Sequence, residues 1–257
     1  MNVINLIYNS IEEIGAGLSE NASRLNIDQL VDLGLIRMIE DKSDKSVLKN
    51  FYQDIDEKIS GYFKIASEKT CEMQSQIFLL PLVKNSFYLD KMNGILAHTD
   101  GDSNIYIYLD IENKVNSNYI KSICIHEYQH ILRNFIGKQK KSKTLLDVFI
   151  DEGCSEAFVE SILGGGFVGN WATNLTPYEL KTYLALYEDK LYITDVYEIQ
   201  KIMYGNQLDI PLWLGYSLGY AIVKSYMENQ TYKDFTDLIK LDPYEVYYKS
   251  SFYDGCL

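Results

Sequence analysis

The sequence predicts an α+β fold in which a small, mostly antiparallel sheet precedes a largely helical C-terminal lobe. Residues 95–110 hold two short apolar runs separated by polar turn residues, which is typical of a β-hairpin. Beyond about residue 117, apolar residues recur with helical spacing. No internal repeat or Pro/Gly/Ser-rich linker divides the chain. We therefore expect a single unit over 1–257, with a helical N-terminal lobe at about 1–75 and a core region at about 76–257.

In the N-terminal lobe, helical periodicity is found in residues 27–40 and 47–63. In the hairpin, Ile or Leu alternates with Tyr or Asp from residue 105 to residue 110. Asp100 and Gly101 supply the turn between its two strands.

Two helices are expected next, at about 117–135 and 144–163, and three consecutive glycines from Gly164 end the second one. A Tyr-rich, helical middle region follows. The last clear helix is expected over 211–229, opened by Pro211.

Composition excludes several classes of protein. A formal net charge of −12 argues against nucleic-acid binding, which depends on clustered Lys and Arg. The basic run at 137–143 is interpreted as a solvated loop. The longest apolar run, near 77–83, is too short for a membrane span, and no basic residue precedes Arg24 as a secretory signal would require. We expect a cytoplasmic protein without a membrane partner, and nothing in the sequence indicates its oligomeric state.

The strongest chemical signal is the stretch HEYQH, which contains two of the three histidines in the chain. Side chains four residues apart on a helix share a face, so His126 and His130 can point at one metal ion. Glu127 lies about 100° around the helix, within reach of a metal-bound water. The alternative is a histidine pair buried in the core and satisfied by hydrogen bonds, although burying these groups together is costly.

A catalytic zinc usually has three protein ligands, and no histidine follows His130. Glu152, Glu156 and Glu160 recur every four residues along one face of the helix at 144–163. Like charges at this spacing destabilise a helix by roughly 0.2–0.5 kcal/mol per pair, and a nearby cation would reverse the effect. Alternatively, the three glutamates form a solvated acidic face of the helix. By spacing alone, either Glu152 or Glu156 could reach the metal.

The motif H-E-x-x-H, followed about twenty residues later by E-G-x-x-x-x-[FY], resembles that of the gluzincin zinc peptidases. HEYQH, TLLDVFIDEGCSEAFVE, Trp171 and GYSLGYAIVKSYM together resemble a bacterial family of uncharacterised zinc-dependent proteases, over about residues 49–227. The resemblance implies a zincin-like fold with an active-site helix, a zinc cofactor and a peptide or protein substrate. It also implies that Glu152, before Gly153, is the third ligand; Gly153 would let the two ligand-bearing helices approach closely.

The chemistry of these residues agrees with that implication. Zinc bound by His126, His130 and Glu152 would lower the pKa of its water toward neutrality. Glu127 would act as general base and then as general acid toward the leaving amine. Glu156 is expected to accept the second N–H of a ligating histidine and so fix its orientation.

Two further parts of such a site are expected. Gluzincins stabilise the oxyanion with a downstream His or Tyr, and Tyr216 or Tyr220 could be that donor. The strand at 104–110 could add an extended substrate to the sheet, or be an ordinary core or edge strand. His98, near the hairpin turn, is interpreted as a surface or hydrogen-bonded residue and not as a ligand.

Two other functions compete with the peptidase. One is a zinc-containing binding or regulatory protein without catalysis, and the other is a zinc hydrolase of a non-peptide amide or ester. A structural zinc site is closed by four ligands, usually including thiolates. Cys124 and Cys154 each lie two residues from an expected ligand and would face away, the other cysteines (Cys71 and Cys256) form no C-x-x-C motif, and a structural metal has no need of Glu127.

Overall fold

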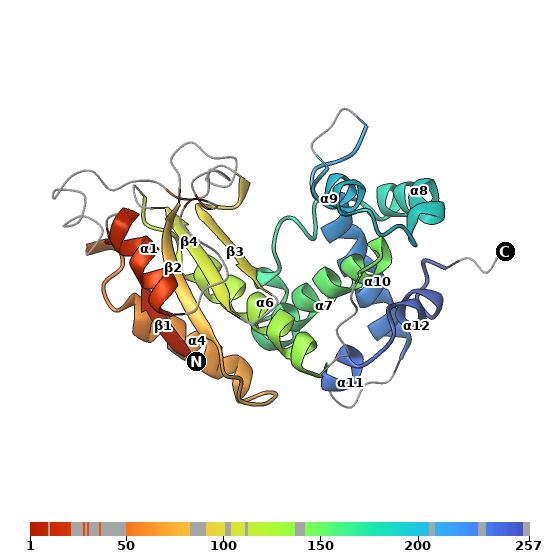
Figure 1. The fold of residues 1–257 in the computed structure, drawn as a ribbon. Coiled ribbons are helices and arrows are strands. Elements are labelled where there is room, and N and C mark those ends of the chain that lie inside the picture. Colours follow the sequence, from red (N-terminus) through yellow and green to blue (C-terminus); the bar gives the residue numbers. More distant parts are fainter. Residues whose placement is uncertain are drawn as a thin grey trace. The chain divides into compact units, whose positions relative to one another are not determined.

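The computed structural model describes residues 1–9, 11–21, 28, 30, 36, 50–82, 91–100, 104–110, 113–136, 142–205, 209–230 and 235–253. The chain divides into two compact units, here called the N-terminal unit (Met1–Ile131) and the C-terminal unit (Leu132–Leu257). Figure 1 shows the elements of both. A single cooperative unit over 1–257 stays a prediction, because a division by contacts does not measure cooperativity of unfolding.

The N-terminal unit contains a four-stranded sheet of order β1-β2-β4-β3. Its strands are β1 (Asn2–Asn5), β2 (Gln76–Leu82), β3 (Ile95–Thr99) and β4 (Ile105–Asp110). The β3–β4 hairpin confirms the expected pairing, although Gly101 of its turn lies outside the described residues. The expectation of a mostly antiparallel sheet is wrong, since β1–β2 and β2–β4 are both parallel.

This mixed topology follows from the connections. Parallel neighbours need a long crossover, and the chain between β1 and β2 includes helices α1 (Ile11–Glu20) and α4 (Ile55–Ser67). Because β4 lies between β2 and β3, its backbone is paired on both sides. The expectation that this strand could pair with an extended substrate is therefore wrong, and β3 is the strand at that edge of the sheet.

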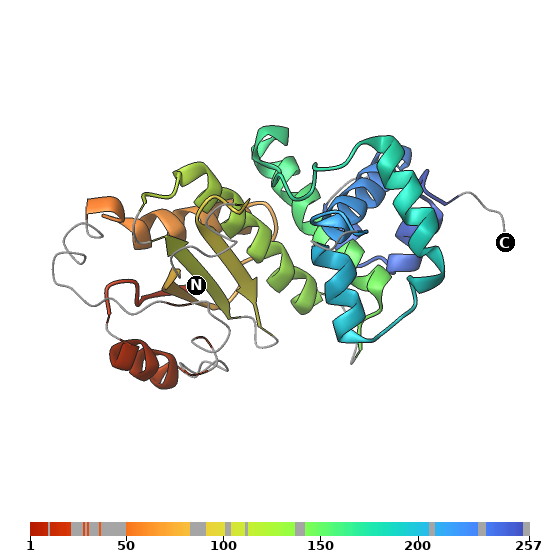
Figure 2. The ribbon, with the colours of Figure 1, turned by 90° about the horizontal axis from the view of Figure 1, so that it is seen from above.

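Helices cover both faces of the sheet in the N-terminal unit (Figure 2). Ile14 and Leu18 of α1 belong to a buried cluster with Phe78, Tyr106 and Tyr108 on one face. Helix α4 and helix α6 (Ser117–Ile136) lie on the other, and α6 continues into the C-terminal unit.

Helices α1 and α4 confirm the prediction of helices within residues 1–75, but strand β1 was not predicted. This strand has only four residues, Asn-Val-Ile-Asn, which are too few to be told from a helix by periodicity. Of the stretch 27–40, only residues 28, 30 and 36 are described, and α4 begins at Ile55, well inside the stretch 47–63.

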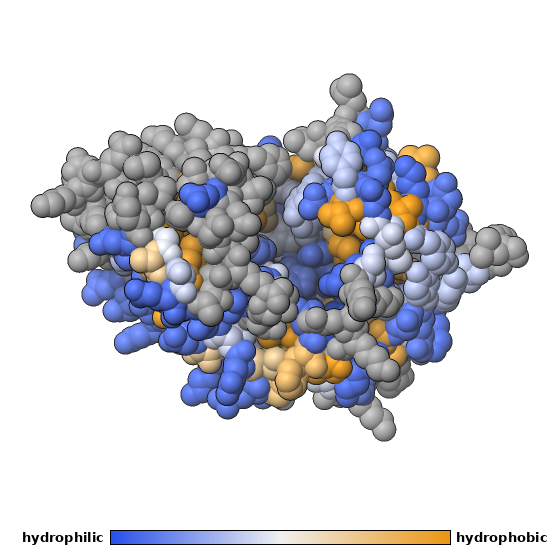
Figure 3. Space-filling model, in the orientation of Figure 1, coloured by the Kyte–Doolittle hydropathy of each residue, from blue (hydrophilic) through white to orange (hydrophobic). Residues whose placement is uncertain are grey.

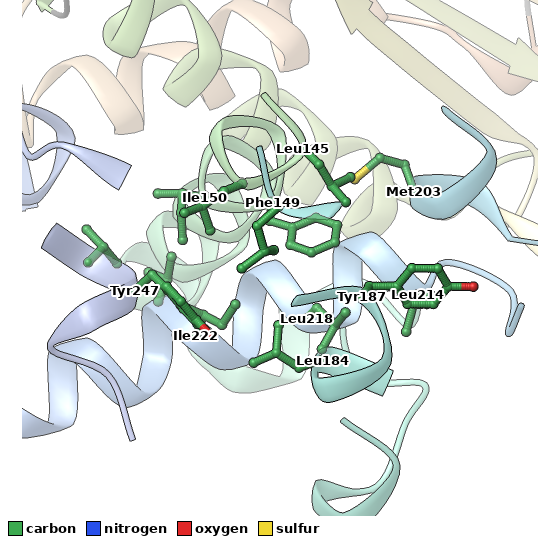
Figure 4. Close-up of a cluster of buried hydrophobic side chains, with 14 of the residues drawn as sticks. Leu145, Phe149, Ile150, Leu184, Tyr187, Met203, Leu214, Leu218, Ile222 and Tyr247 are labelled. Carbon is green, nitrogen blue, oxygen red and sulfur yellow. The ribbon is translucent and has the colours of Figure 1, made fainter. Parts of the chain in front are cut away.

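Within its described residues, the C-terminal unit has helices but no strands, as expected. After the last turn of α6 come α7 (Leu145–Leu163), η1 (Gly165–Phe167), α8 (Pro177–Tyr187), η2 (Glu188–Lys190), α9 (Val196–Tyr204), α10 (Leu214–Asn229), α11 (Phe235–Ile239) and α12 (Pro243–Tyr248). Their apolar faces meet in one core in which Phe149, Met203, Leu218 and Tyr247 are fully or almost fully buried (Figure 4).

Helix α7 begins and ends where the sequence predicts. Thr144 caps it in a capping box with Asp147, and Gly164 follows with a φ of 91°. Helix α10, however, starts at Leu214, so the prediction that Pro211 opens it is wrong. The Pro211 carbonyl accepts a hydrogen bond from the Leu214 N–H, and Trp213, with a φ of 58°, caps the helix after this turn.

The described surface is mostly hydrophilic on the face in Figure 3, in keeping with the acidic composition. None of the described helices has the length and apolar character of a bilayer span. Of the basic run, residues 137–141 lie outside the described residues, and Lys143 pairs with Asp151 of α7 at 2.6 Å.

Helices α7 and α10 touch backbone to backbone at two glycines. A Cβ at Gly153 would overlap the Gly219 carbonyl, and a Cβ at Gly219 would overlap the Phe149 carbonyl. The expectation that Gly153 lies against α6, the other ligand-bearing helix, is wrong. Gly153 therefore gives no reason to prefer Glu152 to Glu156 as a ligand. The glycine instead sets the crossing of α7 with α10.

We expect Gly219→Ala to lower the free energy of unfolding by about 1–3 kcal/mol. The added methyl group would clash with the backbone carbonyl of Phe149, which cannot rotate away. Gly61→Ala is the matched control: Gly61 is exposed within α4 and nothing lies near its missing Cβ, so alanine should raise stability by about 0.5–1 kcal/mol. Chemical denaturation measures both. Equal effects of the two substitutions would contradict the close crossing.

Candidate metal centre

The two motif histidines are neighbours on one face of α6. Their Nε2 atoms lie 3.1 Å apart, with the rings inclined at 70°. His126 is 5% exposed and His130 is half-buried. Two nitrogens bound to one tetrahedral zinc at about 2.0–2.1 Å would be about 3.3 Å apart. The observed separation therefore suits two ligands of one ion.

Glu127 is buried on the same helix, with 3% of its surface exposed. Its Oε2 accepts a hydrogen bond of 2.7 Å from the hydroxyl of Thr99, at the end of β3. Sequence reasoning did not find Thr99, because this contact joins residues 28 apart and depends on how the hairpin lies against α6. A threonine at the end of a strand gives no signal of such a role.

Glu152 of α7 completes a group of three possible metal ligands. One ligand atom from each of His126, His130 and Glu152 lies within 4.8 Å of the others, and among the described residues this is the one group of this kind. Two imidazoles and a carboxylate are a donor set found in catalytic zinc sites, with one position left for water. The residues thus fit a zinc ion.

A buried charge cluster joins the last turn of α6 to α7 within the C-terminal unit. The Arg133 guanidinium pairs with Asp151 through its Nε, and these side chains are only 12% and 10% exposed. Lys143 binds the second Asp151 oxygen at 2.6 Å, and Arg133 also donates to the Ile239 carbonyl at 3.3 Å. Arg133 follows His130 by three residues and Asp151 precedes Glu152, so this cluster is close in sequence to two of the possible ligands.

Glu156 is 1% exposed and holds the chain that follows α7. Its two oxygens accept hydrogen bonds from the Gly169 N–H at 2.9 Å and from the Trp171 indole N–H at 2.7 Å. The Trp171 carbonyl in turn accepts from Ser217 of α10 at 2.8 Å. The expected hydrogen bond from a ligating histidine to Glu156 stays a prediction.

Glu160 has a different partner from the other two glutamates of this face. Lys224 of α10 binds both of its oxygens at 2.6 Å, and the Tyr220 hydroxyl donates to it at 2.9 Å. Burial, followed by the hydrogen bond to Glu160, raises the pKa of Tyr220, which keeps the phenol protonated. Tyr216, one turn earlier, is half-buried beside Tyr204. The role of either tyrosine as oxyanion donor stays a prediction.

His98 lies outside the group of possible ligands. Its ring stacks on those of Tyr106 and Tyr108, at centroid distances of 5.0 and 5.7 Å, and burial lowers its pKa. Cys124 and Cys154 are buried free thiols. Burial raises the pKa of Cys154 to about 11, so it stays a neutral thiol at physiological pH.

The family comparison supports a zinc centre. A family described as "Predicted Zn-dependent protease (DUF2268)" matches residues 55–247. The chain belongs to this family. Its matched region includes α6 and α7, which carry all three possible ligands.

A relative from Bacillus subtilis (strain 168), described as "Uncharacterized protein YjaZ", is 31% identical over 127 residues. The match covers 47% of this chain and 47% of the relative, so the chain spans about half the length of the curated relative it matches. No solved structure matches the chain.

We expect Asp151→Ala to lower the free energy of unfolding by about 3–5 kcal/mol, because it leaves the charge of Arg133 buried without its carboxylate. Replacing both partners, as Arg133→Met with Asp151→Leu, should restore most of that loss. Denaturation in the presence of EDTA keeps metal binding out of the measurement.

The exposed pair Lys190–Glu198, at 3.9 Å, provides the control. Glu198→Ala should change stability by less than about 1 kcal/mol. Asp151→Ala with an effect as small as that of the control would show that the buried pair does not hold α6 to α7.

Proposed function

We propose that the protein is a gluzincin-type zinc peptidase with a zincin-like fold, in which His126, His130 and Glu152 bind one zinc ion. The observation that carries this proposal is the convergence of these three ligand atoms, with Glu127 directly after the first of them. The family description, which names a zinc-dependent protease, supports the same reaction class.

A bound zinc would lower the pKa of its water and polarise the scissile carbonyl. Glu127 would accept a proton as general base and later deliver it to the leaving amine as general acid. The Thr99 hydroxyl donates to Oε2, so we assign the proton exchange to Oε1. A closed structural site would have no task for this carboxylate.

The substrate we propose is a peptide or protein segment bound in extended form. Strand β3 lies at the edge of the described sheet, and its last residue, Thr99, contacts Glu127. An edge strand offers unpaired N–H and C=O groups, and adding a peptide strand there gives affinity with little dependence on side chains. Such pairing would bring the substrate backbone beside the general base.

Supporting roles are proposed for three further residues. Glu156 accepts the second N–H of a ligating histidine, while Gly169 and Trp171 hold its carboxylate in place. Tyr216 or Tyr220 donates a hydrogen bond to the oxyanion formed on attack. For Tyr220 this requires its hydroxyl to turn away from Glu160.

Glu127→Gln should keep bound zinc and lose nearly all hydrolysis, because an amide preserves the shape of the carboxylate but cannot accept the proton. Digestion of a peptide library by the zinc-loaded parent and variant, with and without chelator, measures this. A zinc-loaded parent that cleaves no peptide would favour a zinc-containing binding or regulatory protein without catalysis. Cleavage of esters or non-peptide amides alone would favour a zinc hydrolase of those compounds. A fully active variant would remove Glu127 from the mechanism.

Glu152→Ala should purify without zinc, since two histidines are left to hold the ion. Glu156→Ala should keep zinc but bind it about 10–100-fold more weakly, the usual effect of removing a group that orients a ligand. Metal analysis and chelator competition on the two variants side by side measure the difference. The reverse order would make Glu156 the third ligand.

A further inference from the structure

We propose that Thr99 is a positioning residue for the general base, an inference that rests on the proposed function. Its hydroxyl donates to Glu127 Oε2 at 2.7 Å, and the glutamate carboxylate is almost fully buried. The hydrogen bond fixes one oxygen and thereby the plane of the carboxylate. Oε1 is then presented in one orientation for proton transfer.

The threonine is well suited to hold a carboxylate because its own position is fixed. Thr99 pairs with Ile105 in the β3–β4 ladder. Directly after it, Asp100 accepts hydrogen bonds from the Asn104 N–H at 2.9 Å and from the Tyr106 hydroxyl at 3.0 Å, which anchors the end of the strand. Threonine is also branched at Cβ, so few χ1 rotamers are open to it.

The carboxylate needs such a partner for two reasons. A free glutamate side chain has about 1.5–2 kcal/mol of rotamer entropy, so only a fraction of its conformers would point the base at the water. Displacing a reacting group by about 1 Å can reduce the rate by about 10²-fold. A neutral donor orients Glu127 without supplying the positive charge that would weaken it as a base.

The neighbouring residue on β3 shows that the arrangement is specific to Thr99. His98 stacks on Tyr106 and Tyr108, on the face of the sheet against which α1 packs. Thr99 points to the opposite face, where it contacts Glu127. A strand alternates its side chains between faces, so a hydroxyl at position 98 could not replace the one at 99.

The test compares Thr99→Val, which keeps the shape and removes the donor, with Thr99→Ser, which keeps the donor. On the zinc-loaded full chain with a cleavable peptide, Thr99→Val should lower kcat by about 10–100-fold with KM and zinc content unchanged. Thr99→Ser should stay within a few-fold of the parent. Thr182→Val, which removes a threonine hydroxyl that donates to the Tyr178 carbonyl within α8, is the control and should not change kcat.

If Thr99→Val does not fold, Thr99→Ala removes the same donor without adding an apolar group and replaces it in the comparison. Valine or alanine variants with the kcat of the parent, or a serine variant as slow as valine, would overturn the role of Thr99 while leaving the peptidase intact. A zinc-loaded parent without peptidase activity would instead overturn the proposed function, and the role of Thr99 with it.

Discussion

The close crossing of α7 and α10 is the constraint on which the C-terminal unit depends. Gly153 and Gly219 lie against each other's helices with no room for a side chain. Glu152 precedes the first glycine and Tyr220 follows the second, so the crossing fixes the backbone of both. Any side chain at either glycine would separate the helices and disturb the hydrophobic core that both of them help to form (Figure 4).

The three glutamates of α7 have different surroundings, although they share a face. Glu160 is neutralised by Lys224 of α10, and Glu156 accepts from the neutral donors Gly169 and Trp171. Glu152 is the one that lies with the two histidines. Repulsion between like charges four residues apart is thus offset at Glu160 by a lysine and at Glu156 by two neutral donors.

The parts of the fold and site that the sequence predicted are those set by local spacing. The β-hairpin, the bounds of α7 and the shared face of His126 and His130 follow from alternation, capping residues and helical periodicity. Spacing left Glu152 and Glu156 open as the third ligand, and the resemblance to the gluzincin motif favoured Glu152. Parallel pairing of β1 with β2 was missed because it depends on a crossover of about 70 residues, which no local pattern encodes. The hydrogen bond from Thr99 to Glu127 was not predicted for the same reason, because no local pattern at either residue indicates its partner.

Charge balance connects the metal to the stability of this region. Glu127 is buried and its partner Thr99 is neutral, and Glu152 adds a second carboxylate beside the histidine pair. Burying negative charge is unfavourable unless a cation or several donors offset it. A divalent ion held by the proposed ligands would offset both carboxylates at once, so its binding free energy would also stabilise the native state. The residues proposed for catalysis would then be arranged at lowest free energy only when the metal is bound.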